Sequence, residues 1–343
     1  MANRFDKSGG GFLDLAISQV KKAKTFLDDV DEFVDWRPLD KVLKKKLRRH
    51  KDAVGNPSYP PLAMFRVLLL QRWWDLSDQG MDDALADRIS FRRFVGFSFD
   101  YDTPDSTTIC RFRNHLADRG LDQKLFNMIN GQLEAHELIV KHGVIVDASV
   151  VTSARRPRKT QVIEAVKDRE EDDCDYELTT TYSDDADAKW TIKAKKLYYG
   201  YKIHAATDAE HGFILGGHAT PANHSDTKEL AGVIDECKPV KGSMVFADKG
   251  YASTKNRIGL EEAGFTDGIM YKAARNRPLT EPQKLMNRVI SGLRYKVERA
   301  FGTLKRDYGF HRARYLGCAK VKSQFLLSAI AFNLKKAALM AGP

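Results

Sequence analysis

Two short apolar runs that each end in aspartate place the strongest constraint on the fold of this chain. The first run extends from Gly143 to Asp147, and the second from Ser243 to Asp248. Both are short, apolar and rich in β-branched or aromatic residues, so each predicts a buried strand. Buried strands of this kind lie in sheets that are covered by helices. The sequence therefore predicts an α/β fold in which two strands each deliver a carboxylate.

A third acid follows fifty positions after Asp248. Glu298 lies in a segment that reads as a helix, in which Arg294, Glu298 and Lys305 stand at i, i+4 and i+11 on one face. Carboxylate oxygens are the preferred ligands of Mg²⁺, and a two-metal clamp on phosphate needs them on rigid elements. Three acids on three elements therefore suggest a divalent-metal site. Taken singly, each has a structural alternative: a strand-end turn, an Asp-x-Gly turn, and a surface helix residue paired with Arg294.

The residues around these acids predict a mixed sheet flanked by helices. Strands are expected at 198–207 and 213–220, joined by a hairpin connection, with a helix at 226–236. A charged insertion at 153–196 interrupts the pattern. Residues 12–138 read mainly as helices, with Ser77 as one N-cap and either Asp105 or Ser106 as another. We expect a helical N-terminal domain at 1–138 and an α/β domain at 139–343.

Charge is distributed unevenly along the chain. The net charge is +10, yet residues 1–138 carry 22 Lys and Arg against 21 Asp and Glu, while residues 268–343 carry 16 against 3. A basic surface beside metal-type carboxylates indicates a phosphodiester polyanion as substrate. The alternative is a solvated face that only aids solubility. Residues 161–187 reverse the balance, with 2 against 11; this acidic block is either a solvated loop or a segment that occupies the basic DNA channel of the free protein.

Other features of the sequence narrow the class of protein. No run approaches the roughly 18 apolar residues of a membrane span, and the first residues lack the build of a signal peptide. The four cysteines are scattered, without a C-x-x-C pair. We therefore expect a soluble cytoplasmic protein with reduced thiols and no membrane partner.

Several motifs of this sequence, by their order and spacing, together resemble the insertion-sequence-5 family of bacterial transposases. That family has a ribonuclease-H-like catalytic core with an Asp, Asp, Glu triad. Any one of the motifs is weak, but together they extend over most of the chain, at 64–73, 83–96, 103–113, 146–149, 189–190, 199–204, 221–226 and 247–251.

The resemblance implies a function for the three acids. Asp147, Asp248 and Glu298 would be the catalytic residues and the ligands of two Mg²⁺ ions, for which Mn²⁺ can substitute. One ion would activate a water and later a DNA 3′-hydroxyl, and the other would stabilise the leaving 3′-oxygen. The partners implied are double-stranded DNA, as transposon ends and target, and a second copy of the chain in a homodimer or higher oligomer. The protein would act in the bacterial cytoplasm, at the nucleoid when bound to DNA.

The resemblance also suggests residues that contact DNA. Related transposases carry a Tyr-x2-Arg-x3-Glu-x6-Lys signature, and here Ser291 stands where the Tyr would be. Trp190 either anchors the insertion or stacks on an unpaired base. Arginines of the N-terminal region, with Arg92, Arg93 and the basic run 41–49, either contact terminal inverted repeats or form a salt-bridged helix surface. The DNA-contact residues expected are Arg294, Lys305, Lys249, Trp190, Arg111 and Arg113.

Two further features define what this sequence should lack. The short interval between Asp248 and Glu298 leaves no room for the large β-insertion that some relatives carry there. His204, His211 and His218 recur every seven residues, and since that period alternates faces along a strand, we expect them not to converge on a metal.

Two other functions compete with the transposase interpretation. A ribonuclease-H-like nuclease would cleave DNA without joining it. A domesticated descendant would only bind DNA, although a pure binder has no need of buried carboxylates near an anionic ligand.

Overall fold

A computed structural model describes residues 24–47, 58–155, 157, 160–165, 176–181 and 184–341, with side chains omitted for the two short ranges 160–165 and 176–181. Its first part is helical, as the sequence predicts. The helices are α2 (Phe26–Phe33), α3 (Trp36–Lys46), α4 (Pro61–Trp73), α5 (Asp78–Asp87), α6 (Ile89–Val95), α7 (Ser106–Asp118) and α8 (Leu121–Ala135).

The expected helix caps are confirmed. The side chain of Ser77 accepts a hydrogen bond from the Gly80 amide at 2.9 Å, and that of Asp105 accepts one from the Thr108 amide at 2.6 Å. Each satisfies one of the amide groups that a helix N-terminus leaves unpaired. The residues predicted at 12–23 and at the end of the basic run 41–49 lie outside the described residues.

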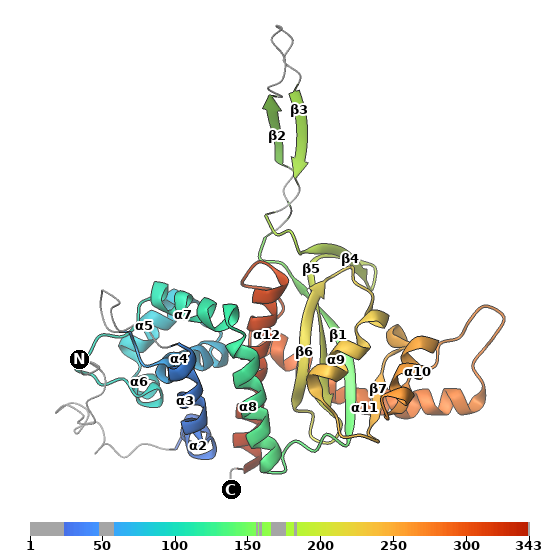
Figure 1. Ribbon diagram of the computed structural model, residues 1–343, viewed down its shortest axis with the longest axis horizontal. Helices are drawn as coiled ribbons and strands as arrows, with labels where there is room; N and C mark the ends of the chain where they lie inside the picture. The colour runs from blue at the N-terminus through green and yellow to red at the C-terminus, as the bar shows by residue number, and fades with distance from the viewer. Residues whose placement is uncertain are drawn as a thin grey trace.

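The second part of the chain alternates strands and helices (Figure 1). One mixed sheet contains six strands, in the order β4-β5-β1-β7-β8, with β6 also paired to β5. β1 runs parallel to β7 and antiparallel to β5, which is the arrangement of a ribonuclease-H-like core. The strands are β1 (Gly143–Thr152), β4 (Lys189–Lys193), β5 (Lys196–Asp208), β6 (Ile214–Pro221), β7 (Met244–Ala247) and β8 (Thr266–Ile269).

Helices cover both faces of this sheet. The helical elements are η1 (Asp226–Lys228), α9 (Leu230–Cys237), η2 (Lys249–Tyr251), α10 (Thr254–Glu262), α11 (Glu281–Asp307) and α12 (Cys318–Ala341). α11 packs on β1, β5 and β7, and α9 packs on β5 and β6 from the other side. Between Asp248 and Glu298 the chain forms only η2, α10, β8 and the first part of α11, which confirms that no β-insertion lies there.

β5 is long because it pairs with two strands in succession along one edge. Gly200 of β5 pairs with Thr152 of β1 on one side and with Lys189 of β4 on the other, while Tyr201 onward pairs with β6. A Cβ at Gly200 would collide with the Val151 carbonyl oxygen, so this position requires glycine. The 153–196 insertion thus returns to the sheet as a β4–β5 hairpin.

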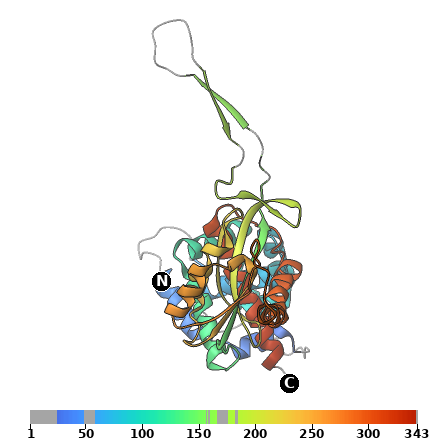
Figure 2. The ribbon, with the colours of Figure 1, turned by 90° about the vertical axis from the view of Figure 1, so that its right-hand side faces the viewer.

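The rest of the described insertion is a two-stranded ribbon. β2 (Thr160–Ala165) pairs with β3 (Tyr176–Thr181) and with no strand of the main sheet. Figures 1 and 2 show this ribbon extending away from the body on the side of β4. The side chains of most of the acidic block lie outside the described residues, so its proposed position in the DNA channel stays a prediction.

The long last helix joins the helical part to the sheet. α12 contacts α2, α4 and α8 and also packs on β6. The indole nitrogen of Trp73 donates a hydrogen bond to the Ala331 carbonyl at 2.8 Å, and Trp73 is buried. The buried apolar residues of the helices and of the sheet therefore form one continuous core.

Candidate active site

Asp147 lies in the middle of β1, one residue beyond the pairing of this strand with β7. It pairs with Ala205 of β5, and the strand continues through Thr152. The expectation that the strand ends at Asp147 is therefore wrong, and the turn-former alternative is excluded with it. One carboxylate oxygen accepts a hydrogen bond from the Ala148 amide at 2.8 Å. Burial raises the pKa of Asp147, and the nearby Arg294 guanidinium opposes that rise.

Asp248 is brought to the same level by the adjacent strand. β7 runs parallel to β1 with Val146 opposite Ala247, so the next residues, Asp147 and Asp248, follow each other in register. Asp248 caps η2, and its Oδ1 accepts a hydrogen bond from the Lys249 amide at 2.5 Å. The tight turn predicted here is present, and it directs a partly exposed carboxylate toward β1.

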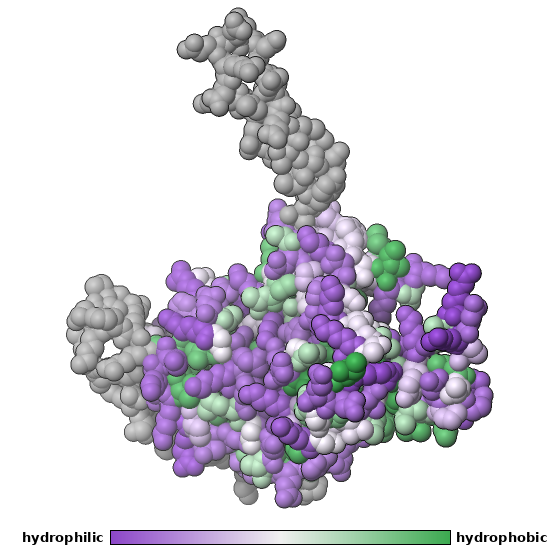
Figure 3. Space-filling view, turned by 45° about the vertical axis from the view of Figure 1, so that its right-hand side comes forward, coloured by the Kyte–Doolittle hydropathy of each residue, from purple (hydrophilic) through white to green (hydrophobic). Residues whose placement is uncertain are grey.

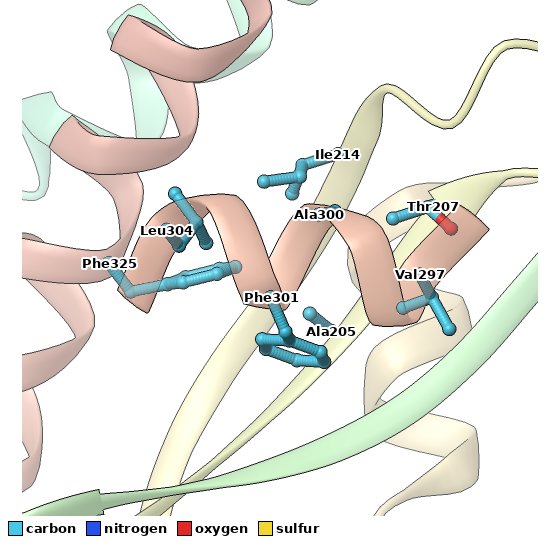
Figure 4. A pocket seen from close by; sticks show the side chains of 8 residues that line it. All are labelled: Ala205, Thr207, Ile214, Val297, Ala300, Phe301, Leu304 and Phe325. Atoms are coloured by element: carbon cyan, nitrogen blue, oxygen red, sulfur yellow. The ribbon is translucent and has the colours of Figure 1, made fainter. Parts of the chain in front are cut away.

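Glu298 is positioned by the packing of α11. Val297, Phe301 and Leu304 are buried on the helix face that lies against Ala205 and Thr207 of β5 (Figure 4). Burying an aliphatic or aromatic side chain of this size stabilises the fold by about 1.5–3 kcal/mol. Glu298 follows Val297 directly, so the same packing fixes it at the border of the contact, exposed and on the Asp147 side of the sheet.

Arg294 joins the three acids. Its Nη2 lies 3.1 Å from Asp147 Oδ2 and 3.6 Å from Glu298 Oε1, and its Nη1 lies 3.6 Å from Asp248 Oδ1. The guanidinium is largely buried, and its Nε has no hydrogen-bond partner among the described residues. The three acids predicted from the sequence therefore do converge, around the Arg294 guanidinium, for which the sequence predicts a DNA contact instead.

The charge balance of this cluster favours further cations. One guanidinium faces three carboxylates, so an excess of negative charge remains when all three are ionised. All donor atoms are carboxylate oxygens, which suit hard ions such as Mg²⁺. Within the described part of the chain, no group of three His, Cys, Asp or Glu side chains is already arranged to hold a metal. The donor chemistry fits a divalent ion, but the carboxylates are spaced around Arg294.

Comparisons with known proteins identify the family of this chain. The family described as Transposase DDE domain matches residues 140–334, and the Transposase domain (DUF772) matches residues 15–115. The transposase for insertion sequence element IS1106 of Neisseria meningitidis serogroup B is 43% identical over 231 residues, which span 66% of this chain and 77% of that protein. The chain belongs to the DDE transposase family. It is a DNA transposase, an enzyme of DNA cleavage and strand transfer, in a family that generally uses divalent metal ions.

Solved transposase complexes are more distant. A piggyBac transposase synaptic complex with hairpin DNA aligns with a TM-score of 0.44 and 11% identity, over 92% of this chain and 75% of that chain. The Mos1 strand transfer complex aligns with a TM-score of 0.21 and 10% identity, over 95% and 91%. Residue roles in this transposase therefore rest on its own geometry.

Four of the basic or aromatic residues expected to contact DNA are accessible to varying degrees. Lys249 and Arg111 are exposed, and Trp190 is 49% exposed beside Tyr199, with ring centroids 5.1 Å apart. Lys305 is partly buried on α11. Burial and the positive charge of Lys193 lower the pKa of Lys305, while Asp147 acts in the opposite direction. Lys305 is therefore near enough to both Lys193 and Asp147 for their charges to act on its pKa.

Arg113 corrects the expectation for the N-terminal arginines. Its side chain is buried, its two terminal nitrogens contact Asp78 at 2.6 and 2.7 Å, and its guanidinium lies 4.5 Å from the Tyr315 ring centroid. A guanidinium held in this way is not available to DNA. Arg93 pairs with Asp28, as in the alternative of a salt-bridged helix surface. Arg92 instead donates to the backbone carbonyls of Leu85 and Ser98.

The expectation that the regularly spaced histidines do not converge is wrong for two of them. His204 and His218 are direct partners in the β5–β6 ladder, with ring centroids 5.5 Å apart. Burial lowers the pKa of His204 to about 3, so its ring is neutral, and its Nδ1 lies 3.3 Å from the Tyr251 hydroxyl. His211 lies apart, at the turn that joins the two strands. The missed signal was the antiparallel pairing of two predicted strands, which brings residues on either side of a hairpin together.

Asp185 was also missed by the sequence analysis. It is buried, and its carboxylate accepts hydrogen bonds from Ser153 Oγ at 2.6 Å and from the Tyr201 hydroxyl at 2.5 Å. Asp187 nearby accepts a hydrogen bond from the Cys318 amide at 2.8 Å. This end of the acidic block is therefore structural, and the solvated-loop interpretation does not apply to it. Asp185 fastens the insertion to β5, and Asp187 fastens it to the start of α12.

One general expectation concerned membranes. In the part of the chain that the structure describes, no helix is long and apolar enough to cross a membrane.

Proposed function

We propose that Asp147, Asp248 and Glu298 are the catalytic acids of this transposase and the ligands of two Mg²⁺ ions, with Mn²⁺ as a substitute. The observation that carries this proposal is their convergence within 3.6 Å of one guanidinium, from two adjacent parallel strands and a helix packed on them. When bound, the ions would supply Lewis-acid activation of the attacking oxygen and stabilisation of the leaving oxygen.

The protein residues have distinct tasks in this proposal. Asp147 is positioned by the backbone of β1, which is paired with β5 at this residue and with β7 just before it. Arg294 keeps the three carboxylates close together and supplies donors for a phosphate oxygen that approaches them. Lys305 and the exposed Lys249 neutralise the DNA backbone on either side, and Trp190 stacks on an unpaired base near the cleaved end. Ser291 is exposed on α11 in place of the tyrosine of the related signature, so that contact is absent from the proposal.

We also propose a division of labour along the chain. Residues 1–138 would bind the terminal inverted repeats and support dimerisation, with Arg111 as a DNA contact, and residues 139–343 would carry out catalysis. Two transposon ends have to be held together, which requires at least a homodimer. Because the substrate is bacterial DNA, the protein would act in the cytoplasm at the nucleoid.

The test uses duplexes that carry the inverted repeats flanking the gene. Asp147→Ala, Asp248→Ala and Glu298→Ala should each abolish Mg²⁺-dependent nicking at the repeat tips and joining of pre-cut ends, while binding of the ends is largely retained. Glu261→Gln, a change of an exposed acid on α10, is the matched control and should remain active. Strand transfer by the Glu298→Ala protein would refute the assignment. Cleavage without joining by the unchanged protein would favour the nuclease interpretation.

A further inference from the structure

The outer part of the β4–β5 hairpin presents an apolar pair to solvent. Ile192 and Leu197 are directly opposite each other in the ladder and are 73% and 61% exposed. Trp190 and Tyr199 form the next pair on the same face, because side chains two apart along a strand share a face. Figure 3 shows hydrophobic patches on the surface of the described body, beside hydrophilic side chains. A surface aliphatic pair of this exposure is unusual on a chain without a partner.

The hairpin is held in a defined shape. Ala194 and Lys195 form its two-residue turn with φ values of 49° and 63°. This left-handed pair is the turn that matches the twist of two antiparallel strands, although glycine or asparagine adopts it more readily. At its base, the insertion is fastened by the buried Asp185. The apolar pair is therefore presented by a hairpin of defined shape, the finger (residues 189–200).

Lysines surround the apolar pair. Lys189, Lys193, Lys195 and Lys196 are all exposed, and no ion pair joins any of them to another residue that the structure describes. A phosphate backbone would supply the charges that these lysines lack. An uncharged apolar partner would leave them unpaired.

Register places this finger on the catalytic face of the sheet. Asp147 pairs with Ala205, and steps of two along β5 lead from Ala205 through Tyr201 to Leu197. Leu197 and its partner Ile192 therefore lie on the same face as Asp147. The influence of Lys193 on Lys305, which also senses Asp147, agrees with a short path from the finger to the acids.

We propose that Ile192 and Leu197 form a wedge that enters the transposon end beside the scissile phosphate and unstacks its terminal base pairs, while the flanking lysines hold the phosphates. Apolar side chains of this kind open base steps in other DNA complexes, and the contact with the exposed bases offsets the cost of unstacking. This inference rests on the proposed function, because it takes the acids at Asp147 as the site of cleavage.

The test measures DNA opening without catalysis. Duplexes of the flanking inverted repeat carry 2-aminopurine at positions next to the cleavage point, and the protein is the full chain with Asp147→Asn, so that no cutting occurs. Binding should raise the fluorescence, and an added Ile192→Ser/Leu197→Ser change should remove most of that rise. The same change should weaken binding to paired ends by about tenfold, and mismatches at the terminal base pairs should restore binding to within about threefold.

Val240→Ser/Ile258→Ser is the matched control, since both residues are exposed aliphatics outside the hairpin. It should leave fluorescence and affinity unchanged. An undiminished fluorescence rise in the hairpin variant would overturn the proposal, as would an equal loss of affinity on paired and mismatched ends. Loss of the dimer in sedimentation, with normal opening of DNA, would assign the pair to a protein interface instead. If the acids are not the catalytic residues, the Asp147→Asn protein still cleaves the duplex, and electrophoresis of the same samples detects the cut strand. The two proposals can therefore fail separately.

Discussion

Arg294 sets the electrostatics of the acidic site at the scale of single residues. Asp147 is largely buried; burial raises its pKa, and the Arg294 guanidinium opposes that rise. Arg294→Gln should therefore raise the pKa of Asp147 further. When the pKa of a carboxyl is higher in the folded than in the unfolded protein, the protein loses stability as the pH rises from the unfolded-state pKa toward the folded-state pKa. We expect the variant to be destabilised by roughly 1–3 kcal/mol at pH 8 and by less at pH 5.

Urea unfolding at the two pH values measures this effect. Adding Asp147→Asn to Arg294→Gln removes the carboxylate that the arginine neutralises, so the double variant should regain stability at pH 8 and lose most of the difference between the two pH values. An Arg294→Gln protein with the same stability loss at pH 5 and pH 8 would show that packing, and not charge, is what Arg294 contributes.

The sequence could identify these residues as functional candidates, but it could not show which partners their side chains face. The three acids were predictable because strand runs and helical spacing place carboxylates at particular positions on elements. The side chain of Arg294 was assigned to DNA, since spacing along a helix says which face a residue occupies and not what stands opposite. Arg113 illustrates the same limit: its partner Asp78 is distant in sequence, and only packing reveals the pair.

At the scale of elements, a buried amide pair ties α8 and α12 to the edge strand β6. Asn333 is fully buried; its Oδ1 accepts from the Ile214 amide at 2.9 Å, and its Nδ2 donates to the Ile214 carbonyl at 2.8 Å and to Asn130 Oδ1 at 2.9 Å. Asn333→Leu would leave the Ile214 amide without a partner in the core. We expect a loss of about 2–4 kcal/mol in unfolding free energy, measured from urea unfolding followed by circular dichroism.

Asn127→Leu is the control for this change, because Asn127 is an exposed residue of the same helix as Asn130. Its effect should stay within about 0.5 kcal/mol. If Asn333→Leu is equally mild, the amide network is not what holds β6 to the helices.

Most elements of the main sheet were predictable from local pattern. Strands β1, β5, β6 and β7 were expected because apolar runs, turn residues and a hairpin connection are local signals. β4 and the β2–β3 ribbon were not, since their strands are polar and charged and resemble loop in composition. β1 extends beyond Asp147 for a related reason: its last residues are paired with β5 and the chain near Arg312, which no local pattern reveals.

At the scale of the whole molecule, the basic C-terminal quarter of the chain forms α11 and α12 and meets the catalytic face. Residues 268–343 carry 16 Lys and Arg against 3 Asp and Glu. One lysine of this basic segment, Lys305, is close enough to Asp147 for the two charges to interact. Among the described residues, Lys305 has no carboxylate partner within ion-pair distance. DNA that reaches Asp147 should therefore pass close to Lys305.

Salt dependence tests this path. Each phosphate that a protein neutralises adds about 0.9 to the magnitude of the slope of log affinity against log salt concentration. Lys305→Gln should therefore reduce the slope for transposon-end DNA by about one, and Lys305→Arg should retain it. Lys284→Gln is the control, because Lys284 lies near the start of α11 and is already paired with Glu281 at 2.7 Å. Binding curves at several salt concentrations give the slopes, and an unchanged slope in Lys305→Gln would exclude this lysine from the phosphate contacts and direct the DNA path away from the C-terminal half of α11.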